Sequence, residues 1–360
     1  MSQQPEKKKV ICLIECLESG GAQRQLIGLA SMLKEKGYDV TVATYYNNEF
    51  YKPLLDTCGV GYHLICDGGN KLSMLRAFWK YLHSASPDYV ISFSETSSMI
   101  ACAMRPFLNT QLVVSERNNI INYTFSDRLR IHLYRFADKI VSNSYSQGKF
   151  IEKHASFLAK KSSVIVNFVD TDTFSPIPDA CQHDDTTRLI CVARVTPQKN
   201  MERLIEALKM IRDDGWRLKF DWYGNTTDPY AAHCASLIQQ HSLGDMLRIH
   251  QPASNIHDIY PRYDALCLPS IHEGTPNVVA EAMSCELPIL CGDVCDNRLI
   301  VGDSGNLLFD PYSPDDIKNQ LEAFCRLSQE SRQQIGKANR KRALDMFSKE
   351  KFIDRYLQLI

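Results

Sequence analysis

The sequence has no long apolar segment and no excess of charge of one sign. No run of about 18 consecutive apolar residues occurs, so no segment is expected to span a bilayer. The apolar run near the start is short and is interrupted by Glu15, which argues against a secretory signal peptide. Lys and Arg number 41 against 42 Asp and Glu, so no overall field favours nucleic acid. We therefore expect a cytoplasmic protein that binds no nucleic acid.

The usual cysteine patterns are missing as well. The 13 cysteines are odd in number and contain neither a Cys-x-x-Cys pair nor a histidine–cysteine group at zinc-ligand spacing. We interpret them as reduced thiols, which fits a reducing cytosol. The dinucleotide fingerprint Gly-x-Gly-x-x-Gly is also absent. The sequence therefore favours neither a disulfide-rich scaffold nor a zinc site.

What the sequence does contain is a repeated alternation of short apolar runs and amphipathic segments. An apolar run at 10–14 is followed by a glycine-rich turn, a helix-like segment that ends near Gly37, and a second apolar run at 40–43. Strand, helix and strand in this order predict a parallel sheet with right-handed crossovers. The alternation continues and starts again at 189–193. The sequence therefore predicts an α/β fold with two doubly wound, Rossmann-like domains.

Length and a change of composition predict the domain boundary. A chain of 360 residues suits about two domains of ordinary size. Residues 178–187 are polar and show no periodicity, so we place the boundary there. We predict a first domain over 1–177, a second over 178–342, and a helical C-terminal segment over 343–360.

The stretch 270–290 carries a clear helix start. It follows a strand-like run at 265–268. Thr275 suits the N-cap, and Pro276 suits the first helical position, where its missing N–H costs nothing. We therefore expect the helix to begin at Pro276.

Two glutamates flank this helix start. Glu273 precedes it, and Glu281 lies about a turn and a half inside it. The backbone N–H groups of Asn277 and Val278 would point out of the helix, where its dipole favours anionic or hydroxyl-rich ligands. On their own, the glutamates are equally compatible with one solvated and one ion-paired residue.

The pattern Glu-x7-Glu after an apolar strand, with glycine and proline between the glutamates, resembles the donor site of retaining GT-B glycosyltransferases of family 4. The resemblance implies the GT-B fold, in which two Rossmann-like doubly wound domains face each other across a cleft. It implies that Glu273 is a catalytic residue at the donor sugar and that Glu281 holds the ribose hydroxyls of the nucleotide. The donor-binding segment would also include Gly274, Thr275, Pro276, Asn277 and Val278.

A second motif lies on the loop after the strand-like run at 189–193. Arg194 and Lys199 are five positions apart and can converge on one diphosphate, because Arg offers a fork of donors and Lys a point charge. The resembling family carries such a pair for the nucleotide diphosphate. The alternative is two solvated loop cations. Gly224 ends the next strand-like run and matches one glycine of a pair that the family often has at that turn.

The glycine-rich turn of the first domain contains Gly20 and Gly21, followed by Ala22. In the resembling family this turn lines the cleft opposite the donor, so both glycines would let the backbone approach a phosphate or a sugar. The alternative is a tight turn that requires a positive φ.

The first domain departs from the family at one position. Many family members place a histidine near the end of the strand at 112–115, where it touches the donor sugar. Here the strand end carries Glu116 and Arg117. We take Glu116 as a second candidate catalytic residue and leave open whether Glu116 or Arg117 replaces the histidine. The alternative is a surface ion pair between the two.

The middle of the first domain has a basic bias with interleaved aromatic residues. The basic residues are Arg105, Arg117, Arg128, Arg130, Arg135 and Lys139, and the aromatic ones are Phe107, Tyr123, Phe125 and Tyr134. Such a set forms either a solvated face or a face that meets an anionic membrane surface.

Together the motifs predict a retaining hexosyl-type glycosyltransferase. It would move a sugar from a UDP- or GDP-linked donor to a saccharide or lipid-linked saccharide acceptor in polysaccharide or glycoconjugate assembly. In the family, cationic side chains replace a metal ion, so the resemblance implies no metal and no cofactor, with the nucleotide sugar as substrate. It also implies that the last helix crosses back onto the first domain. The protein could lie peripherally on the inner face of the membrane.

Two other functions stay open at this stage. One is a nucleotide-sugar epimerase of GT-B fold, which product analysis would separate from a transferase. The other is a non-catalytic subunit that binds a sugar nucleotide. It would release no nucleoside diphosphate when an acceptor is present.

Overall fold

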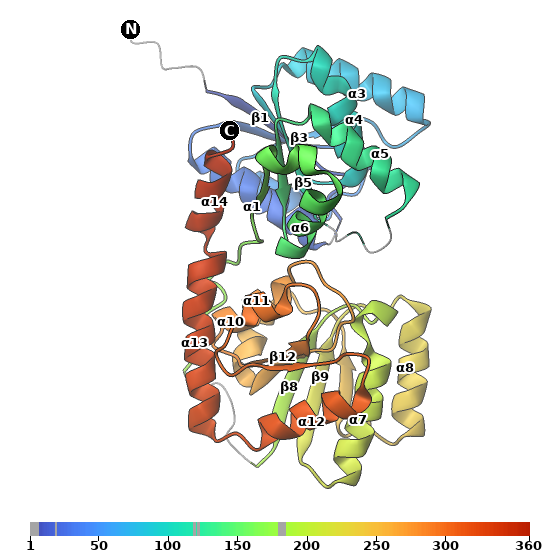
Figure 1. Cartoon of the computed structure of the whole chain (residues 1–360), viewed down its shortest axis with the longest axis vertical. Coiled ribbons are helices and arrows are strands. Elements are labelled where there is room, and N and C mark those ends of the chain that lie inside the picture. The colour runs from blue at the N-terminus through green and yellow to red at the C-terminus, as the bar shows by residue number, and fades with distance from the viewer. Residues whose placement is uncertain (1–6, 19, 118–119, 121–122, 179–184) are drawn as a thin grey trace. The chain divides into compact units, whose positions relative to one another are not determined.

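The computed structural model of the chain contains two compact units (Figure 1). Unit 1 comprises Met1–Asn167 and Glu350–Ile360, and unit 2 comprises Phe168–Lys349. The structure describes residues 7–18, 20–117, 120, 123–178 and 185–360.

Unit 1 is built on a parallel sheet of seven strands in the order β3-β2-β1-β4-β5-β6-β7. The strands are β1 Lys9–Leu13, β2 Asp39–Thr44, β3 Gly61–Leu64, β4 Tyr89–Ser92, β5 Gln111–Glu116, β6 Lys139–Ser142 and β7 Ser162–Val164. The inner strands are buried along almost their whole length, which explains why they appear in the sequence as continuous apolar runs. The strand order reverses between β1 and β4. The loops after these two strands therefore diverge and leave a crevice at their carboxyl ends.

The helices of unit 1 pack on this sheet and close its core. They are α1 Gly21–Glu35, α2 Lys52–Thr57, α3 Lys71–Ala85, α4 Glu95–Met104, α5 Phe125–Leu133, α6 Tyr145–His154 and most of α14 Lys349–Leu357, with short 3-10 segments η1 Arg105–Phe107, η2 Tyr134–Phe136 and η3 Ser156–Lys161. Phe78 and Leu82 of α3 and Tyr134 of η2 are fully buried against strand residues such as Val90 and Leu112. This apolar layer fixes the positions of the strand ends.

Unit 2 has a parallel sheet of six strands in the order β10-β9-β8-β11-β12-β13. The strands are β8 Thr187–Val192, β9 Leu218–Tyr223, β10 Leu247–His250, β11 Ala265–Leu268, β12 Ile289–Gly292 and β13 Leu307–Phe309. Its helical segments are η4 Pro197–Lys199, α7 Met201–Asp213, α8 Pro229–Gln240, α9 Ile256–Ile259, η5 Tyr260–Arg262, α10 Asn277–Ser284, α11 Asn297–Val301, α12 Pro314–Cys325 and α13 Gln329–Phe347. Here the order reverses between β8 and β11. The predicted α/β fold with two doubly wound, Rossmann-like units is confirmed.

Helix α10 begins one residue later than the sequence predicts. Pro276 occupies the N-cap with φ −72° and ψ 109°, and its side chain makes no capping hydrogen bond. The predicted N-cap at Thr275 is therefore wrong, because the extended ψ of Pro276 keeps that residue out of the helix. The helix packs on the sheet through Val279, Ala282 and Met283, which are fully buried.

The connector between the units packs on unit 2. The backbone N–H of Val169 donates to the carbonyl of Phe347 at 2.8 Å. The Arg340 guanidinium donates to the carbonyls of Thr171 and Phe174. The units accordingly join at Asn167 and at Lys349, whereas the sequence places the divisions at 177 and 342. The first boundary was predicted from the polar residues 178–187, of which 179–184 lie outside the described residues.

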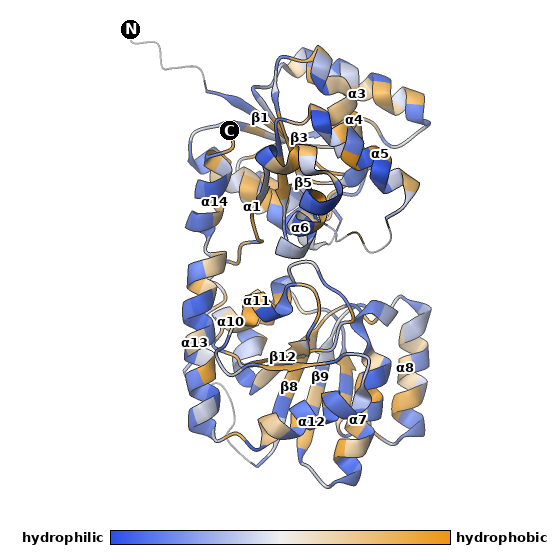
Figure 2. Ribbon diagram, in the orientation of Figure 1, coloured by the Kyte–Doolittle hydropathy of each residue, from blue (hydrophilic) through white to orange (hydrophobic). Residues whose placement is uncertain are grey.

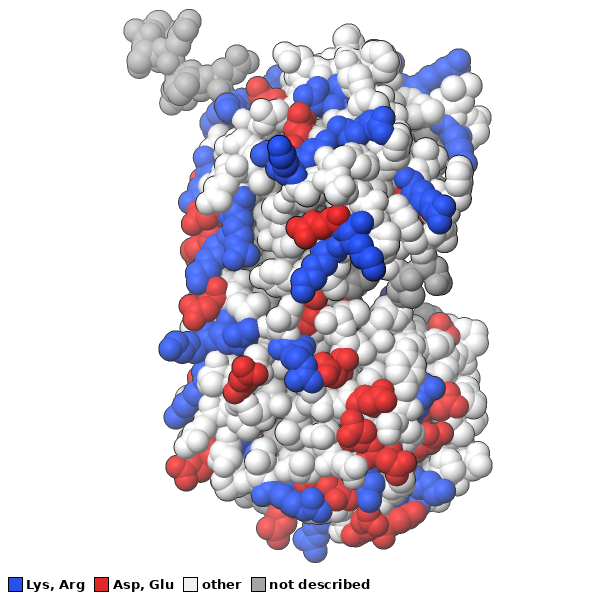
Figure 3. Space-filling view, viewed as in Figure 1, with Lys and Arg blue, Asp and Glu red and all other residues white. Residues whose placement is uncertain are grey.

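Hydropathy follows the layers of each unit (Figure 2). The strands are largely apolar, whereas polar and apolar residues alternate along the helices. In the described part of the chain, no helix combines the length and the apolarity needed to cross a membrane. On the visible face of unit 1, basic side chains predominate over acidic ones, while both signs are mixed on unit 2 (Figure 3).

Candidate active site

Two loops meet where the strand order of unit 2 reverses. The loop after β8 carries the Arg194…Lys199 motif, and the loop after β11 carries Glu273. The backbone N–H of Ile271 donates to the carbonyl of Gln198 at 3.0 Å. The Gln198 side-chain amide returns a bond to the carbonyl of His272 at 3.0 Å. These bonds hold the two loops together at the carboxyl edge of the sheet, where open α/β sheets bind their ligands.

The structure brings Lys199 and Glu273 into direct contact. The Lys199 Nζ lies 2.5 Å from Glu273 Oε1, and the two side chains are 17% and 8% exposed. Because either charge alone would be desolvated without compensation, this buried ion pair holds both side chains in one geometry. The cation and the carboxylate are thus positioned as one unit.

Asn200 fixes this arrangement, although no motif in the sequence indicates its role. It adopts the left-handed conformation with φ 62°, which asparagine tolerates better than most residues. Its side-chain amide donates to the carbonyls of Pro269 at 3.0 Å and Pro311 at 2.7 Å, and its oxygen accepts from Arg203. The one signal in the sequence is an asparagine directly before a helix, which is too common to indicate three anchored segments.

Arg194 differs from Lys199 in its surroundings. It is exposed, and among the described residues it has no hydrogen-bond or ion-pair partner. The next residue is anchored, because the backbone N–H of Val195 donates to the carbonyl of Asn225 at 2.9 Å. Arg194 is therefore a solvent-facing cation on a fixed stem, at the same sheet edge as Lys199.

Gly224 allows the two loops at the ends of β8 and β9 to approach each other. A Cβ at this position would lie 1.8 Å from the carbonyl oxygen of Ala193. That carbonyl also accepts a bond from the Trp222 indole at 2.7 Å. Only glycine fits here, so Gly224 shapes the floor of the site by backbone packing.

The rest of the predicted donor segment is partly buried. Glu281 is only 4% exposed, and the Tyr260 hydroxyl donates to its Oε2 at 3.3 Å. Thr275 and Pro276 are buried, while Gly274, Asn277 and Val278 are half-buried. The segment thus presents its backbone and small side chains at the sheet edge and keeps the second glutamate underneath.

A cavity of about 310 Å³ opens at the corresponding crevice of unit 1. Its lining comes from the loops after β1, β4 and β5 and from the start of α1, and includes Glu15, Gln23, Ser94, Glu95, Thr96 and Arg117. The Arg117 guanidinium lies 4.5 Å from the centre of the Phe93 ring and donates to Asn167 Oδ1 at 2.6 Å. Burial lowers the pKa of this guanidinium. Carboxylates, hydroxyls and one cation together form a lining suited to hydroxyl-rich ligands.

The glycine-rich turn borders this cavity. Gly20 precedes α1 with φ −159° and ψ 158°, and Gly21 is the first helical residue. The alternative of a tight turn with positive φ is therefore wrong, since neither glycine is among the positive-φ residues of the described chain. A Cβ on Gly20 would lie 2.3 Å from the side-chain oxygen of Gln23. The preceding residue, Ser19, lies outside the described residues.

Glu116 does not reach the cavity. Successive residues of a strand point to opposite faces, and the Glu116 side chain is turned into the interior, where it is 2% exposed. The Tyr134 hydroxyl donates to its Oε1, and Arg130 lies 3.6 Å from its Oε2. Burial raises the pKa of this carboxyl. The predicted catalytic placement of Glu116, and the alternative of a surface pair with Arg117, are both corrected by this geometry, and Arg117 is the polar residue that faces the cavity.

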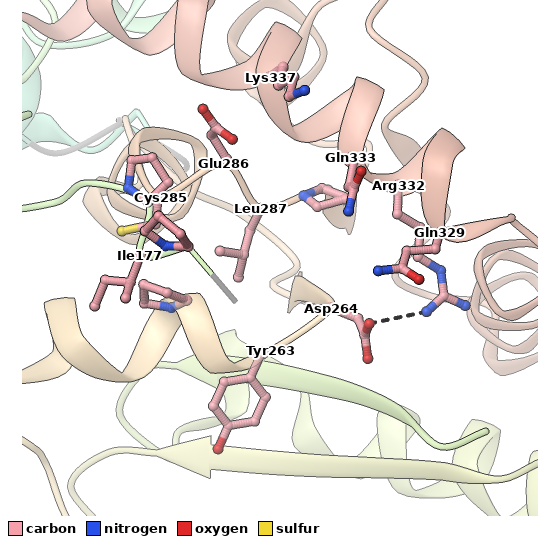
Figure 4. A pocket seen from close by; sticks show the side chains of 14 residues that line it. Ile177, Tyr263, Asp264, Cys285, Glu286, Leu287, Gln329, Arg332, Gln333 and Lys337 are labelled. Atoms are coloured by element: carbon pink, nitrogen blue, oxygen red, sulfur yellow. Dashed lines mark ion pairs between the residues drawn. The ribbon is translucent and has the colours of Figure 1, made fainter. Parts of the chain in front are cut away.

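Unit 2 has a cavity of about 430 Å³, which lies at the amino ends of the strands, the edge of the sheet opposite to the Lys199–Glu273 pair (Figure 4). Its lining includes Asp264 and Pro288, which directly precede β11 and β12. Arg332 and Asp264 form an ion pair at 3.2 Å within it. Because ligands of such sheets bind at the carboxyl ends of the strands, this cavity is no part of the candidate active site.

No metal centre is evident in the part of the chain that the structure describes. No group of three or more His, Cys, Asp or Glu side chains there could hold a metal ion. Metal independence of the reaction stays a prediction.

Two family models together match most of the chain. The model described as Glycosyltransferase Family 4 matches residues 19–173. The model described as Glycosyl transferases group 1 matches residues 178–342. The first match contains the glycine-rich turn and most of the residues that line the cavity of unit 1, although Ile14 and Glu15 precede it. The second contains the Lys199–Glu273 pair.

Individual relatives also match over most of the chain. The amylovoran biosynthesis glycosyltransferase AmsD of Erwinia amylovora is 24% identical over 317 residues, which are 84% of this chain and 88% of that protein. A Campylobacter jejuni alpha-1,4-N-acetyl-D-galactosaminyltransferase, named for a PP-undecaprenol-linked saccharide, is 24% identical over 298 residues, or 78% of this chain and 77% of that protein. The crystal structure of HepE from Anabaena in complex with UDP and glucose matches with a TM-score of 0.85 and 16% identity over 98% of both chains. At this identity, the likeness to HepE shows the fold alone.

Proposed function

Because the chain belongs to the group 1 glycosyltransferases, we propose that it transfers a sugar from a nucleoside-diphosphate sugar to a saccharide acceptor with retention of anomeric configuration. The donor would be UDP- or GDP-linked, and the product would enter a polysaccharide or glycoconjugate. The observation that carries the proposal is the Lys199–Glu273 pair at the carboxyl edge of the unit 2 sheet. Support for the donor comes from HepE, which was crystallised with UDP.

In this proposal, Lys199 exchanges its partner Glu273 for the diphosphate of the donor when the donor binds. The Lys199 ammonium lies at the site with its charge balanced by Glu273. An incoming diphosphate offers oxygens that Lys199 and the exposed Arg194 can bind together. Glu273 would then be released to accept hydrogen bonds from sugar hydroxyls. The two cations stabilise the negative charge that develops on the diphosphate as the sugar leaves it.

Glu281 would serve the nucleoside. Its carboxylate is held from below by the Tyr260 hydroxyl at 3.3 Å. A carboxylate is an acceptor only, and it can take hydrogen bonds from two neighbouring ribose hydroxyls. Because Glu281 sits in a helix that is buried against the sheet, its position does not depend on the ligand.

The acceptor would bind in the cavity of unit 1. Glu15, Glu95 and Ser94 offer acceptors to sugar hydroxyls, and Arg117 offers donors. A lipid-linked saccharide is one acceptor class, in line with the Campylobacter jejuni relative named for a PP-undecaprenol saccharide. The cavity size suits one or two sugar units rather than a long chain.

The test is release of nucleoside diphosphate from UDP- and GDP-sugars in the presence of saccharide acceptors. Lys199→Ala and Glu273→Ala are expected to slow release by about a hundredfold or more, because each removes a group that acts on the leaving group or the sugar. Lys318→Ala is the matched control, since Lys318 is paired at 2.6 Å with Asp214 on the surface of the same unit. NMR of the anomeric proton of the product determines retention. Equal rates in wild type and both site variants would contradict the proposal.

A further inference from the structure

Large apolar side chains are exposed mainly on unit 1. The described chain exposes fifteen of them, and eleven belong to unit 1. Eight of the eleven lie on α3, α5 and the short segments that adjoin them: Leu72, Leu75, Trp79, Phe107, Phe125, Leu129, Phe136 and Phe157. We call this surface the α3–α5 face. Single exposed apolar residues are ordinary, but a gathering of this size on a few elements marks an interaction surface.

Helix α3 shows that the exposure is not a by-product of packing. Its inner stripe, Met74, Phe78 and Leu82, is buried against the sheet. A helix on the surface of a globular protein needs only this one apolar stripe. Yet α3 carries a second, outer stripe beside the buried one, formed by Leu72, Leu75 and Trp79, which are 58%, 37% and 39% exposed.

The exposed rings lie against one another across elements. Trp79 of α3 and Phe107 of η1 have ring centres 6.2 Å apart in an edge-to-face arrangement. His132 of α5 and Phe157 of η3 are similarly placed at 6.3 Å. Phe107 and Phe125 are 71% and 82% exposed, so the rings project from the surface. The apolar residues thus form patches rather than isolated points.

The charge on these elements is almost entirely of one sign. Segments α3, η1, α5, η2 and η3 contain nine Lys and Arg and a single Asp. That aspartate, Asp127, is paired with Arg130 at 3.0 Å. Helix α3 has no acidic residue, and Arg76 and Lys80 flank its outer stripe. The whole chain has a net charge of −1, so this is a local concentration of positive charge, and it is in keeping with the predominance of basic side chains in Figure 3.

The structure revises the basic and aromatic set that the sequence indicated. Arg130 and Tyr134 are buried, and Arg105 is paired with Asp138 at 2.8 Å. Arg117 faces the cavity of unit 1. Arg128, Arg135, Phe107 and Phe125 remain on the exposed surface, and the residues of α3 join them.

We propose that the α3–α5 face docks on the surface of an anionic lipid bilayer. Aromatic and leucine side chains enter the boundary between headgroups and acyl chains, and the flanking cations meet the lipid phosphates. Charge complementarity selects this partner. A second copy of the chain using the same face would bring like charges together, which opposes a symmetric dimer. The α3–α5 face contains none of the residues that we assign to sugar transfer. The proposal does not depend on which donor the protein uses.

Flotation of the full chain with vesicles tests the proposal. One set of vesicles is phosphatidylcholine alone, and the other is an equal mixture of phosphatidylcholine and phosphatidylglycerol. The wild type is expected to float with the mixed vesicles and not with phosphatidylcholine alone, and added salt should weaken the binding. Trp79→Ser with Phe125→Ser, and separately Arg76→Glu with Lys80→Glu, should each weaken binding by about tenfold or more.

Matched variants in unit 2 are the controls. Tyr312→Ser with Leu344→Ser removes two exposed apolar side chains away from the face, and should leave flotation unchanged. Circular dichroism checks that all variants are folded, and transfer to a water-soluble saccharide without vesicles should be the same for all of them. The proposal is overturned if the wild type does not float, if the face variants float as well as the wild type, or if the control loses binding equally. A dimer in sedimentation velocity that Trp79→Ser disperses, without flotation, would assign the face to a second copy instead.

Discussion

At the scale of single residues, Lys199 and Glu273 are held together out of water, with side chains 17% and 8% exposed. Removing one partner leaves the other charge desolvated. We expect Lys199→Met to lower the free energy of unfolding by about 1–3 kcal/mol, and Lys199→Met with Glu273→Gln to recover most of that loss. Urea denaturation of the four proteins of this double-mutant cycle gives the coupling energy. A coupling near zero would show that the contact contributes nothing.

Glu286 occupies a backbone conformation that favours glycine. It follows α10 with φ 62°. The left-handed conformation costs a residue with a Cβ about 1–2 kcal/mol in the folded state. Glycine avoids this cost, but it also gives the unfolded chain more conformational entropy, which offsets part of the gain. Glu286→Gly should therefore stabilise the protein by about 0.5–1 kcal/mol in thermal or urea denaturation.

The control for this substitution is Glu206→Gly, in the exposed part of α7. Glycine in a regular helix should lower stability by about 1 kcal/mol. If both substitutions destabilised the protein alike, the strain assigned to Glu286 would be absent.

The sequence predicted the residue types of the candidate site better than their directions. It identified Lys199 and Glu273 by family resemblance, but their contact depends on how two loops 74 positions apart are held together. It could not tell which of Glu116 and Arg117 faces the cavity. That choice is made by Tyr134 and Arg130, which bind the Glu116 carboxylate from a helical layer whose position the sequence does not show.

At the scale of elements, α13 packs on the end of α10 through a glycine. A Cβ on Gly336 would lie 2.0 Å from the carbonyl oxygen of Glu286, which is backbone and cannot turn away. Gly336→Ala should therefore push α13 outward and lower the free energy of unfolding by about 2 kcal/mol or more. Gly244→Ala is the control, because nothing lies within 4 Å of its added Cβ, and it should be neutral. Equal stability of the two variants would mean that the helices slide apart without loss.

Helices and strands could be predicted where a short stretch of sequence carries the whole hydrophobic pattern. Buried parallel strands such as β4 and β11 are continuous apolar runs bounded by turns, so their existence follows from the sequence. The start of α10 was missed by one residue because threonine followed by proline is a common helix start, while the extended ψ of Pro276 is visible only in the structure. Gly224 had a family match, but its physical reason, the closeness of Ala193, needs coordinates.

At the scale of the whole molecule, the doubly wound fold followed from the alternation of strands and helices. The junction between the units did not. Polar composition at 178–187 indicates a surface loop, but the chain passes from one unit to the other at Asn167. Residues 168–174 belong to unit 2 because Arg340 binds their carbonyls, a contact 166 to 169 positions distant in sequence.

The whole enzyme should work without a divalent metal ion. In the proposed mechanism, Arg194 and Lys199 meet the charge of the diphosphate. An excess of EDTA should then leave the rate of nucleoside diphosphate release unchanged, and added Mg²⁺ should alter it by less than about twofold. Loss of activity in EDTA that Mn²⁺ or Mg²⁺ restores would assign the charge stabilisation to a metal.

The central claim is that the carboxyl edge of the unit 2 sheet binds a nucleoside diphosphate. Calorimetric titration of UDP and GDP into the full-length wild type, Arg194→Ala, Lys199→Ala and Arg117→Ala tests it most directly. We predict that at least one diphosphate binds the wild type and Arg117→Ala equally, and binds Arg194→Ala and Lys199→Ala about tenfold or more weakly. The claim is contradicted if neither diphosphate binds the wild type, or if both unit 2 variants bind as tightly as the wild type.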